Sequence, residues 1–356
     1  MHDADIKACE EVIEMATVAE SKWEIKVPDK PLKDKVYFEN LKSVVIDTEI
    51  CSRCLTCAAV CPGGIIVVGD KVDFPDYETK CLDCGACVRV CPRFVYEPLS
   101  GMGSSTAFIA GRSKRFAGQD GAMVTELIVS AMEMGIIDRG LFAGRNENWE
   151  TEMFHVRDPE QLAITTLSGT KYTFADVLPE LKKAVKFTKN GVGVVGTPCI
   201  VSGVRKLQQE YPIFREKVKL VVGLFCTENF HYSAISQYLR DKGVDFSKLV
   251  KTDITMGKFI ATMTDSEVKF KVKALEEILP SGCNVCCDFT AVEADASVGS
   301  VGSVPGFSTI SVREAIAQKI LDYIKEQGYA EFGEADPGQL GFLVGHKKKR
   351  AENLKK

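Results

Sequence analysis

The sequence of 356 residues lacks long apolar runs and has little net charge. No apolar stretch approaches the roughly 18 residues of a membrane-spanning helix, and the longest candidate, around residues 218–226, has only the length of a strand. A formal net charge of −4 is too small to predict a nucleic-acid partner. The acidic, amphipathic start is unlike a secretory signal. A cytoplasmic protein is therefore expected, one that could still dock on the cytoplasmic face of a membrane complex.

Common catalytic constellations are also missing. The four histidines are scattered, without metal-ligand spacing or a nucleophile beside them: His2, His155, His231 and His346. No Walker loop occurs, and the stretch that begins Gly191-Val-Gly lacks the third glycine of a dinucleotide fingerprint. The sequence therefore gives no sign of nucleophilic catalysis, or of nucleotide binding by either of these loops.

Cysteine, by contrast, is abundant, with 14 residues. So many thiols are unusual in a reducing compartment unless metal holds them. Eight of them lie in two runs of identical spacing, each followed by proline. The runs are Cys51-x-x-Cys54-x-x-Cys57-x-x-x-Cys61-Pro62 and Cys81-x-x-Cys84-x-x-Cys87-x-x-x-Cys91-Pro92.

This spacing is typical of bacterial-type ferredoxins with two [4Fe–4S] clusters. Three cysteines at i, i+3 and i+6 wrap one face of a cubane, and the fourth ligates the other cluster. We therefore expect one cluster on Cys51, Cys54, Cys57 and Cys91, and the second on Cys81, Cys84, Cys87 and Cys61. Zinc is the alternative, but zinc has no use for a thiolate supplied from the other repeat. Two clusters in a small module predict a path along which electrons pass one at a time.

The pattern of the chain changes after the cysteine runs. Residues 1–43 are expected to form an N-terminal helix and an extended segment, and residues 44–97 the cluster module. The Gly- and Ser-rich segment 98–105 is predicted to be a linker. Strand and helix patterns then alternate over residues 106–340, as in a mainly parallel α/β sheet. The basic tail, residues 341–356, is expected to be solvated and mobile, although a docking role is the alternative.

Several segments of the core have a clear helix or strand pattern. Strands are predicted at 108–111, 192–196 and 218–225, with antiparallel strands between 249 and 273. Helices are predicted at 122–134, 172–186, 232–242 and 312–327. Asp120 is placed to cap the first of these helices and Gly135 to end it.

Four further cysteines could hold a third cluster. Cys199 and Cys226 each follow a predicted buried strand, and ligand sites in open α/β sheets gather at the carboxyl ends of strands. Cys283-x-x-Cys286 would complete a set of four thiolates, with Cys287 as the alternative to Cys286. Cys199 and Cys226 could instead be small buried hydrophobic residues, a common role of free cysteine. The C-x-x-C pair weighs against that interpretation.

A flavin is expected if these clusters receive electrons from a hydride carrier, because flavin accepts two electrons together and releases them singly. Gly- and Ser-containing loops could let its pyrophosphate approach free backbone N–H groups. The candidate cofactor-binding residues are Gly118, Asp120, Gly121, Val124, Thr125, Ser168, Gly169, Thr170, Lys171, Tyr172, Thr197, Pro198, Gly299, Ser300 and Gly302. Each of these loops could also be an ordinary turn. Arg112, Lys114 and Arg115 are further candidates for anionic groups, with solvated surface charge as the alternative for the last two.

The core also resembles a known family, the beta subunits of coenzyme F420-reducing hydrogenase and F420-dependent formate dehydrogenase. The similar stretches occur in family order over about 230 residues of the chain. They are GQDGAMVTELIVSAMEMGIID (118–138), SGTKYT (168–173), GTPC (196–199), GLFCTENF (223–230), DITMGKF (253–259) and GCNVCCDFTAVEADASVGSVG (282–302).

This resemblance implies FAD, hydride exchange with the deazaflavin coenzyme F420, and a [4Fe–4S] cluster. The family's cluster ligands correspond to Cys199, Cys226, Cys283 and Cys286. Cys287 departs from the family's pattern, which leaves open which of the neighbouring thiols binds iron. Ala122 and Met123 depart from it in the flavin loop, where small residues are more usual.

A two-cluster module ahead of this core resembles the electron-input subunits of archaeal F420H2 dehydrogenases. That resemblance implies oxidation of reduced coenzyme F420 by hydride transfer to FAD. Single electrons would then pass through three [4Fe–4S] clusters to a membrane F420H2:phenazine or quinone oxidoreductase complex, or to ferredoxin. F420-dependent sulfite reductase and a plant-type chlorophyll reductase share parts of this architecture. The sulfite enzyme needs a further sirohaem domain, for which this chain has no room.

The expected fold is therefore α+β, with a 2[4Fe–4S] ferredoxin-like module followed by an α/β flavin-binding core with a mixed sheet. No catalytic side chain is predicted, because hydride transfer needs proximity and orientation more than an acid or a base. The first functional alternative is a non-catalytic polyferredoxin adaptor. The second is a reductase of the same family that acts on another organic substrate.

Overall fold

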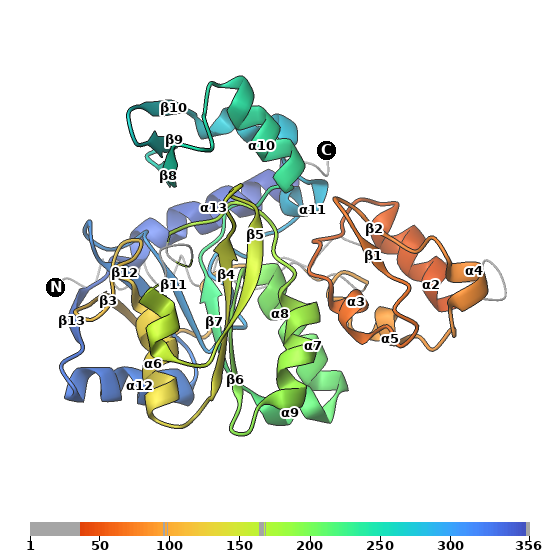
Figure 1. Cartoon of the computed structure of the whole chain (residues 1–356), viewed down its shortest axis with the longest axis horizontal. Coiled ribbons are helices and arrows are strands. Elements are labelled where there is room, and N and C mark those ends of the chain that lie inside the picture. The colour runs from red at the N-terminus through yellow and green to blue at the C-terminus, as the bar shows by residue number, and fades with distance from the viewer. Residues whose placement is uncertain (1–35, 95–96, 98, 164–166, 168, 354–356) are drawn as a thin grey trace.

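The computed structural model describes residues 36–94, 97, 99–163, 167 and 169–353. The segment predicted over 1–43 therefore lies mostly outside the described residues, and so does the candidate cofactor residue Ser168. The chain forms a small N-terminal module beside a larger core (Figure 1).

None of the described helices has the length and apolar character needed to cross a bilayer.

The N-terminal module is built around the two cysteine runs. Its helical elements are α2 (Val36–Leu41), the π-helical turn η1 (Lys42–Ile46), α3 (Thr56–Val60), α4 (Tyr77–Lys80) and α5 (Ala86–Arg89). Its strands β1 (Val67–Val68) and β2 (Val72–Asp73) pair antiparallel. A small apolar cluster that includes Leu41, Val44 and Phe74 lies beside most of the cysteines of both runs. The cysteine side chains therefore make up much of the interior of the module.

The core contains a sheet of eight strands, and this sheet is mixed, as the sequence predicts. Its strands are β3 (Ala107–Ser113), β4 (Arg139–Arg145), β5 (Thr151–Val156), β6 (Val192–Gly196), β7 (Val218–Leu224), β11 (Ala296–Gly299), β12 (Ser308–Val312) and β13 (Ala330–Glu334). Their order is β13-β3-β12-β11-β7-β6-β4-β5. The central strands β11, β7, β6 and β4 are mutually parallel, whereas the outer pairings are antiparallel. Two successive antiparallel steps bring β3 back to the direction of β11, so five strands end at one edge.

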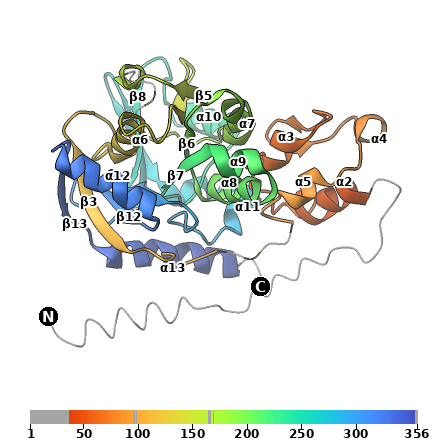
Figure 2. The same ribbon diagram turned by 90° about the horizontal axis from the view of Figure 1, so that it is seen from below.

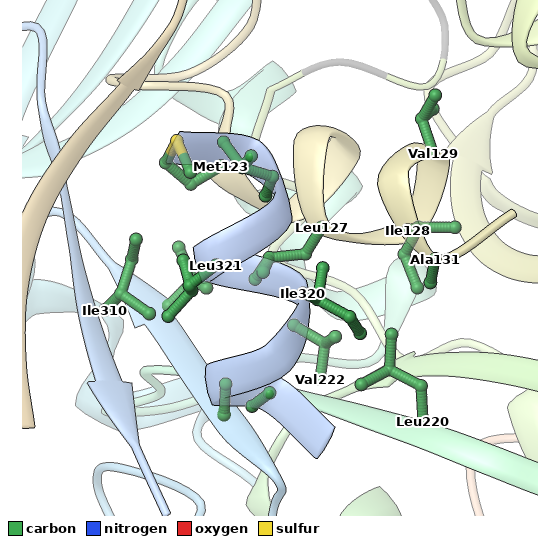
Figure 3. Packing of buried hydrophobic residues seen from close by; sticks show 14 of the residues in the cluster. Met123, Leu127, Ile128, Val129, Ala131, Leu220, Val222, Ile310, Ile320 and Leu321 are labelled. Atoms are coloured by element: carbon green, nitrogen blue, oxygen red, sulfur yellow. The ribbon is translucent and has the colours of Figure 1, made fainter. Parts of the chain in front are cut away.

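Helices cover both faces of this sheet (Figures 1 and 2). They are α6 (Met123–Glu133) and α12 (Ala315–Glu326) on one face, and α7 (Val177–Phe187), α8 (Pro198–Glu210) and α9 (Pro212–Lys217) on the other. On β7, Leu220 and Val222 pack in the cluster of the first face (Figure 3), and Val221 packs in that of the second. Burial on both faces explains why this strand is a continuous apolar run in the sequence.

A second, antiparallel sheet lies above the carboxyl edge of the large one (Figure 1). Its strands are β8 (Leu249–Thr255), β9 (Lys258–Met263) and β10 (Glu267–Lys271), which confirms the antiparallel strands predicted between 249 and 273. Nearby elements are α10 (Tyr232–Asp241) and the 3-10 helix η3 (Val272–Ile278). The remaining short elements are the 3-10 helix η2 (Pro159–Ala163) and α11 (Ser281–Asn284).

The last helix, α13 (Pro337–Asn353), differs from the solvated tail predicted for residues 341–356. It crosses the edge where the parallel strands end (Figure 1). Leu340, Lys347 and Ala351 are buried, and their spacing of seven and four residues places them on one side of a helix. The prediction was wrong because most residues of the tail are polar or charged, and only these three residues of the helix, on one side of it, are buried.

Three other boundaries differ from the predictions. The helix predicted from residue 172 begins at Val177, because Tyr172 accepts a backbone hydrogen bond from Phe230 (2.9 Å) and cannot start a helix. The helix predicted from 312 begins at Ala315, since β12 continues to residue 312. Asp120 does not cap α6: the N-cap is Ala122, in a left-handed conformation and without a side-chain cap.

Candidate functional site

The first thiol set of the module contains cysteines from both runs. Burial raises the pKa of Cys57 well above its ordinary value, and the neighbouring thiols of Cys54, Cys91, Cys51 and Cys87 raise it further. Burial also raises the pKa of Cys91, with Cys54 and Cys51 as its neighbouring thiols. Cys91 therefore lies with the first run, which is where the cross-over pattern puts it. The name set A is used below for Cys51, Cys54, Cys57 and Cys91.

The second thiol set, set B, takes three cysteines from the second run and one from the first. It contains Cys81, Cys84, Cys87 and Cys61. Burial raises the pKa of Cys87 to about 12, and Cys81, Cys84 and Cys61 are the thiols that add to this effect. All four cysteines line one cavity of the module. Cys84 is exposed, so this set reaches the surface.

The two runs fold in the same way, which prepares similar surroundings for both sets. Residues at equivalent positions, Arg53 and Asp83, take left-handed conformations with φ of 52° and 47°. Their backbone N–H groups donate to Cys51 Sγ and Cys81 Sγ, each at 3.4 Å. A left-handed conformation costs a non-glycine residue about 1–2 kcal/mol. Both runs keep this strained conformation at the residue whose backbone N–H points to a cysteine sulfur.

The donor sets suit a cubane better than a single ion. Within the described parts of the chain, no three His, Cys, Asp or Glu side chains lie close enough together to hold one ion. Zinc draws its thiolates together at Zn–S distances of about 2.3 Å. In a [4Fe–4S] cluster each thiolate binds a different iron, so the sulfur atoms lie farther apart. Sets of four cysteines, each with one thiol supplied by the other run, fit [4Fe–4S] clusters.

A third set, set C, lies at the carboxyl edge of the large sheet and contains Cys199, Cys226, Cys283 and Cys286. Cys199 is in the first turn of α8, directly after β6, and Cys226 follows β7. Burial raises the pKa of Cys199 to about 12, with Cys283 and Cys286 among the thiols that raise it further. Burial likewise raises the pKa of Cys226, where Cys283, Cys199 and Cys286 contribute. Four thiols from three segments thus share one space.

Sets A and C face each other across the contact between module and core. Cys54 of set A is among the thiols that raise the pKa of Cys199 in set C. Beside them, Arg93 Nη2 donates to the carbonyl of Gly282 at 3.5 Å, and Ser281 Oγ donates to Glu49 Oε2 at 3.0 Å. Helix α3 packs against α7 at the same contact. The three sets therefore form a row, C–A–B.

Two basic residues of α13, which the sequence prediction missed, cover set C. Lys347 Nζ donates to Cys286 Sγ at 3.3 Å, and Arg350 Nη2 donates to the carbonyl of Cys283 at 3.2 Å. The only signal in the sequence was the position of Lys347 on the same helix side as Leu340.

Two of the predicted cofactor loops meet at the same edge through Gln119. Its Oε1 accepts the N–H of Thr170 at 3.0 Å, and its Nε2 donates to Asp253 Oδ1 at 3.1 Å. Gln119 and Asp253 lie in the stretches that resemble the family, but the sequence analysis did not predict them as site residues. Burial and the nearby Asp253 raise the pKa of Asp120 above its ordinary value. The structure therefore brings the loops 118–121 and 169–172 together under β8.

Several of the glycines that were predicted to bind a cofactor also have a structural role. A Cβ at Gly121 would meet the carbonyl oxygen of Gly111 and lie 2.6 Å from Ser308 N. A Cβ at Gly299 would meet the ring of Phe225. Gly302 has φ of 96° and accepts the N–H of Asp336 at 2.6 Å, just before α13. Close packing explains glycine at positions 121 and 299, and the positive φ explains glycine at position 302.

The other described candidates lie at helix starts and at the end of β11. Val124 and Thr125 are in the first turn of α6, partly buried, and Ser300 directly follows β11 and is exposed. Thr197 and Pro198 start α8, and Thr197 Oγ1 lies 3.3 Å from Cys199 Sγ. Thr197 thus contacts a thiol of set C.

Two partly buried basic residues, Lys171 and Arg145, lie beside the paired loops. Burial, together with the nearby Arg145, lowers the pKa of Lys171 to about 7. Burial also lowers the pKa of Arg145, whose guanidinium stacks 4.0 Å from the centre of the Trp149 ring. An anion bound here would favour the charged forms of both groups. The position could hold the pyrophosphate of a flavin dinucleotide, since Gly169, with φ of 80°, has no side chain and lies beside Arg145.

The predicted basic cluster of Arg112, Lys114 and Arg115 does not converge on this site. Arg112 lies on β3 in register with Glu331, and the N–H of Lys114 donates to Tyr329 O. Arg115 pairs with Glu126 at 2.5 Å and Glu133 at 2.6 Å, and lies over the Tyr329 ring. Arg115 is therefore part of the packing between α6 and the end of α12.

Replacing Glu126 with alanine is expected to destabilise the core without affecting cluster content. Glu126 is fully buried and also accepts a hydrogen bond from Ser113 at 2.6 Å. Removing one member of such a buried pair typically costs about 3 kcal/mol or more, and here Arg115 would keep only the more exposed Glu133 while Ser113 would lose its acceptor. Urea unfolding should show this loss. Glu133→Ala, which removes the more exposed partner, should cost less than about 1 kcal/mol. Equal effects would contradict the central role of Glu126.

Comparison with known proteins agrees with the fold of the chain. Residues 106–182 and 189–338 match the N-terminal and C-terminal models of the coenzyme F420 hydrogenase/dehydrogenase beta subunit. Residues 50–95 match a 4Fe–4S dicluster domain.

The similarity to individual relatives extends over most of the chain. This chain is 32% identical over 302 residues to a subunit of the F(420)H(2) dehydrogenase of Methanosarcina mazei, covering 80% of this chain and 84% of that protein. It is 33% identical over 307 residues to the coenzyme F420-dependent sulfite reductase of Methanocaldococcus jannaschii, covering 79% of this chain but only 47% of that protein.

A solved structure also matches. It is a chain of the F420-reducing [NiFe] hydrogenase complex from Methanosarcina barkeri, with a TM-score of 0.66 and 30% identity, covering 71% of this chain and 91% of that chain. These matches confirm the predicted resemblance: the chain belongs to the coenzyme F420 hydrogenase/dehydrogenase beta-subunit family of oxidoreductases, with an iron–sulfur dicluster domain ahead of the family core.

Proposed function

We propose that this protein oxidises reduced coenzyme F420 and delivers the electrons one at a time to a protein partner. The observation that carries this proposal is the row of thiol sets C–A–B, which starts beside the candidate cofactor loops and ends at the surface. FAD and three [4Fe–4S] clusters, when bound, would supply the conversion of a two-electron hydride into single electrons.

The residues at the start of the row would bind and orient the cofactors. Gln119 holds the loops 118–121 and 169–172 together, and thereby fixes the backbone groups that a dinucleotide would approach. Arg145 and Lys171 supply positive charge for its phosphates. No side chain of this region needs to act as an acid or a base, because hydride transfer depends mainly on proximity and orientation.

The residues at the other end of the row would meet the partner. Cys84 of set B is exposed, and the neighbouring Leu82 has 69% of its surface exposed. Cys57 of set A and Cys87 of set B are neighbours, which joins the last two sets. We propose that the acceptor docks here, and that it is a membrane F420H2:phenazine or quinone oxidoreductase complex, or ferredoxin.

The test is an anaerobic assay of the purified, cofactor-loaded protein. We expect about twelve irons and one FAD per chain, together with reduction of a viologen dye by F420H2 but not by NADH or formate. About eight irons and no flavin would instead support the polyferredoxin adaptor. A flavin-loaded protein that does not respond to F420H2 would overturn the proposal and favour a reductase of another organic substrate.

A further inference from the structure

Lys347 is a buried ammonium group in contact with set C. It lies on α13, far from the cysteines in sequence, and only 1% of its surface is exposed. Its Nζ donates to Cys226 O at 2.8 Å, Asp288 O at 2.6 Å and Cys286 Sγ at 3.3 Å. Three donors meet three acceptors, so the ammonium is held in one place and its charge is fixed beside sulfur.

The charge itself needs an explanation, because burial of a lysine is costly unless negative groups surround it. Lys347 Nζ faces two backbone carbonyl oxygens, Cys226 O and Asp288 O, and the sulfur of Cys286. Cysteine ligates metal only as the thiolate, so set C with its cluster would place negative charge around the buried ammonium.

Arg350 provides a natural comparison on the same helix. Its guanidinium donates to Thr227 O at 2.6 Å and Cys283 O at 3.2 Å, and it pairs with Glu228 at 2.8 Å. Its charge therefore has its own carboxylate and reaches backbone rather than sulfur. The contacts of Arg350 are explained if it closes the edge of the site. Such a role does not explain why the ammonium of Lys347 points at Cys286 Sγ.

We propose that Lys347 is a positioning residue that raises the reduction potential of the cluster held by set C. Reduction of a [4Fe–4S] cluster adds one electron and one negative charge, with no bond made and no proton moved. A fixed positive charge and an N–H···S hydrogen bond both favour the reduced form. The inference rests on the proposed function, in which set C holds the cluster that receives electrons first.

The test is an EPR-monitored redox titration of the loaded protein and of its Lys347→Met variant, which keeps length but removes charge. At a fixed potential we expect the ratio of reduced to oxidised set C cluster to fall about tenfold, equivalent to about 59 mV for one electron. The clusters of sets A and B are internal controls and should shift less. Arg350→Gln should also shift the set C potential less than Lys347→Met does.

The outcomes separate the two proposals. A wild-type protein without a third cluster would overturn the proposed function, and this inference with it. A third cluster whose potential is the same in wild type and Lys347→Met would overturn the inference alone. If the variant does not load the cluster, wild-type protein labelled with ¹⁵N-lysine carries the test by pulsed EPR. A ¹⁵N coupling to the reduced set C cluster is expected, and its absence would refute the role of Lys347.

Discussion

A Cys226→Ala variant is expected to lose the set C cluster and, with it, delivery of electrons to the module. Cys226 follows β7 and is half-buried, with the other three thiols of its set as neighbours. Alanine leaves β7 and its packing unchanged but supplies no ligand, so the iron content should fall by about four per chain. F420H2 should still bleach the flavin, whereas reduction of an acceptor that docks at set B should fall to the background rate.

Cys287→Ala is the matched control for this variant. Cys287 is also a buried cysteine, adjacent to Cys286, and it was the alternative ligand in the sequence prediction. If the four thiols of set C are the ligands, this variant should keep its iron and its rate of electron delivery. Loss of about four irons in Cys287→Ala, together with their retention in Cys286→Ala, would move the ligand assignment by one residue.

Sets A and B are the part of the site that the sequence predicts best, because their pattern is one of local spacing. The cross-over of Cys61 and Cys91 follows from chain geometry within one repeat. The parallel strands were also predictable, since burial on both faces leaves a continuous apolar run such as residues 218–224. In both cases the information lies within a few neighbouring residues.

Contacts between distant segments explain what the sequence did not reveal. Gln119 joins Thr170 and Asp253, and nothing in the local pattern around any of them indicates the other two. Arg115 looked like a free basic residue because its partner Glu126 faces inward from α6. Lys347 was assigned to a solvated tail, since a charged residue is almost never fully buried without a partner, and its partners lie on other segments.

A Gly282→Ala variant is expected to separate set C from set A and so to slow the transfer of electrons from core to module. A Cβ at Gly282 would meet the carbonyl oxygen of Cys51 and lie 2.7 Å from its carbonyl carbon. Both are backbone atoms of the first ligand loop, so no side-chain rotation can relieve the clash. The core loop must move away, which should cost about 1–3 kcal/mol of stability. The wider gap should slow reduction of the module clusters, while F420H2 still bleaches the flavin at the wild-type rate.

Gly341→Ala tests whether the effect is specific to the contact between sets. Gly341 lies in α13, where a Cβ has no atom within 4 Å. Alanine there should therefore be neutral, or stabilise the helix by up to about 1 kcal/mol, and leave transfer unchanged. Stopped-flow absorption separates flavin bleaching from cluster reduction in each variant. If Gly282→Ala kept the wild-type rate of cluster reduction, electrons would not have to cross the contact between Gly282 and Cys51, and the row C–A–B would not be the path.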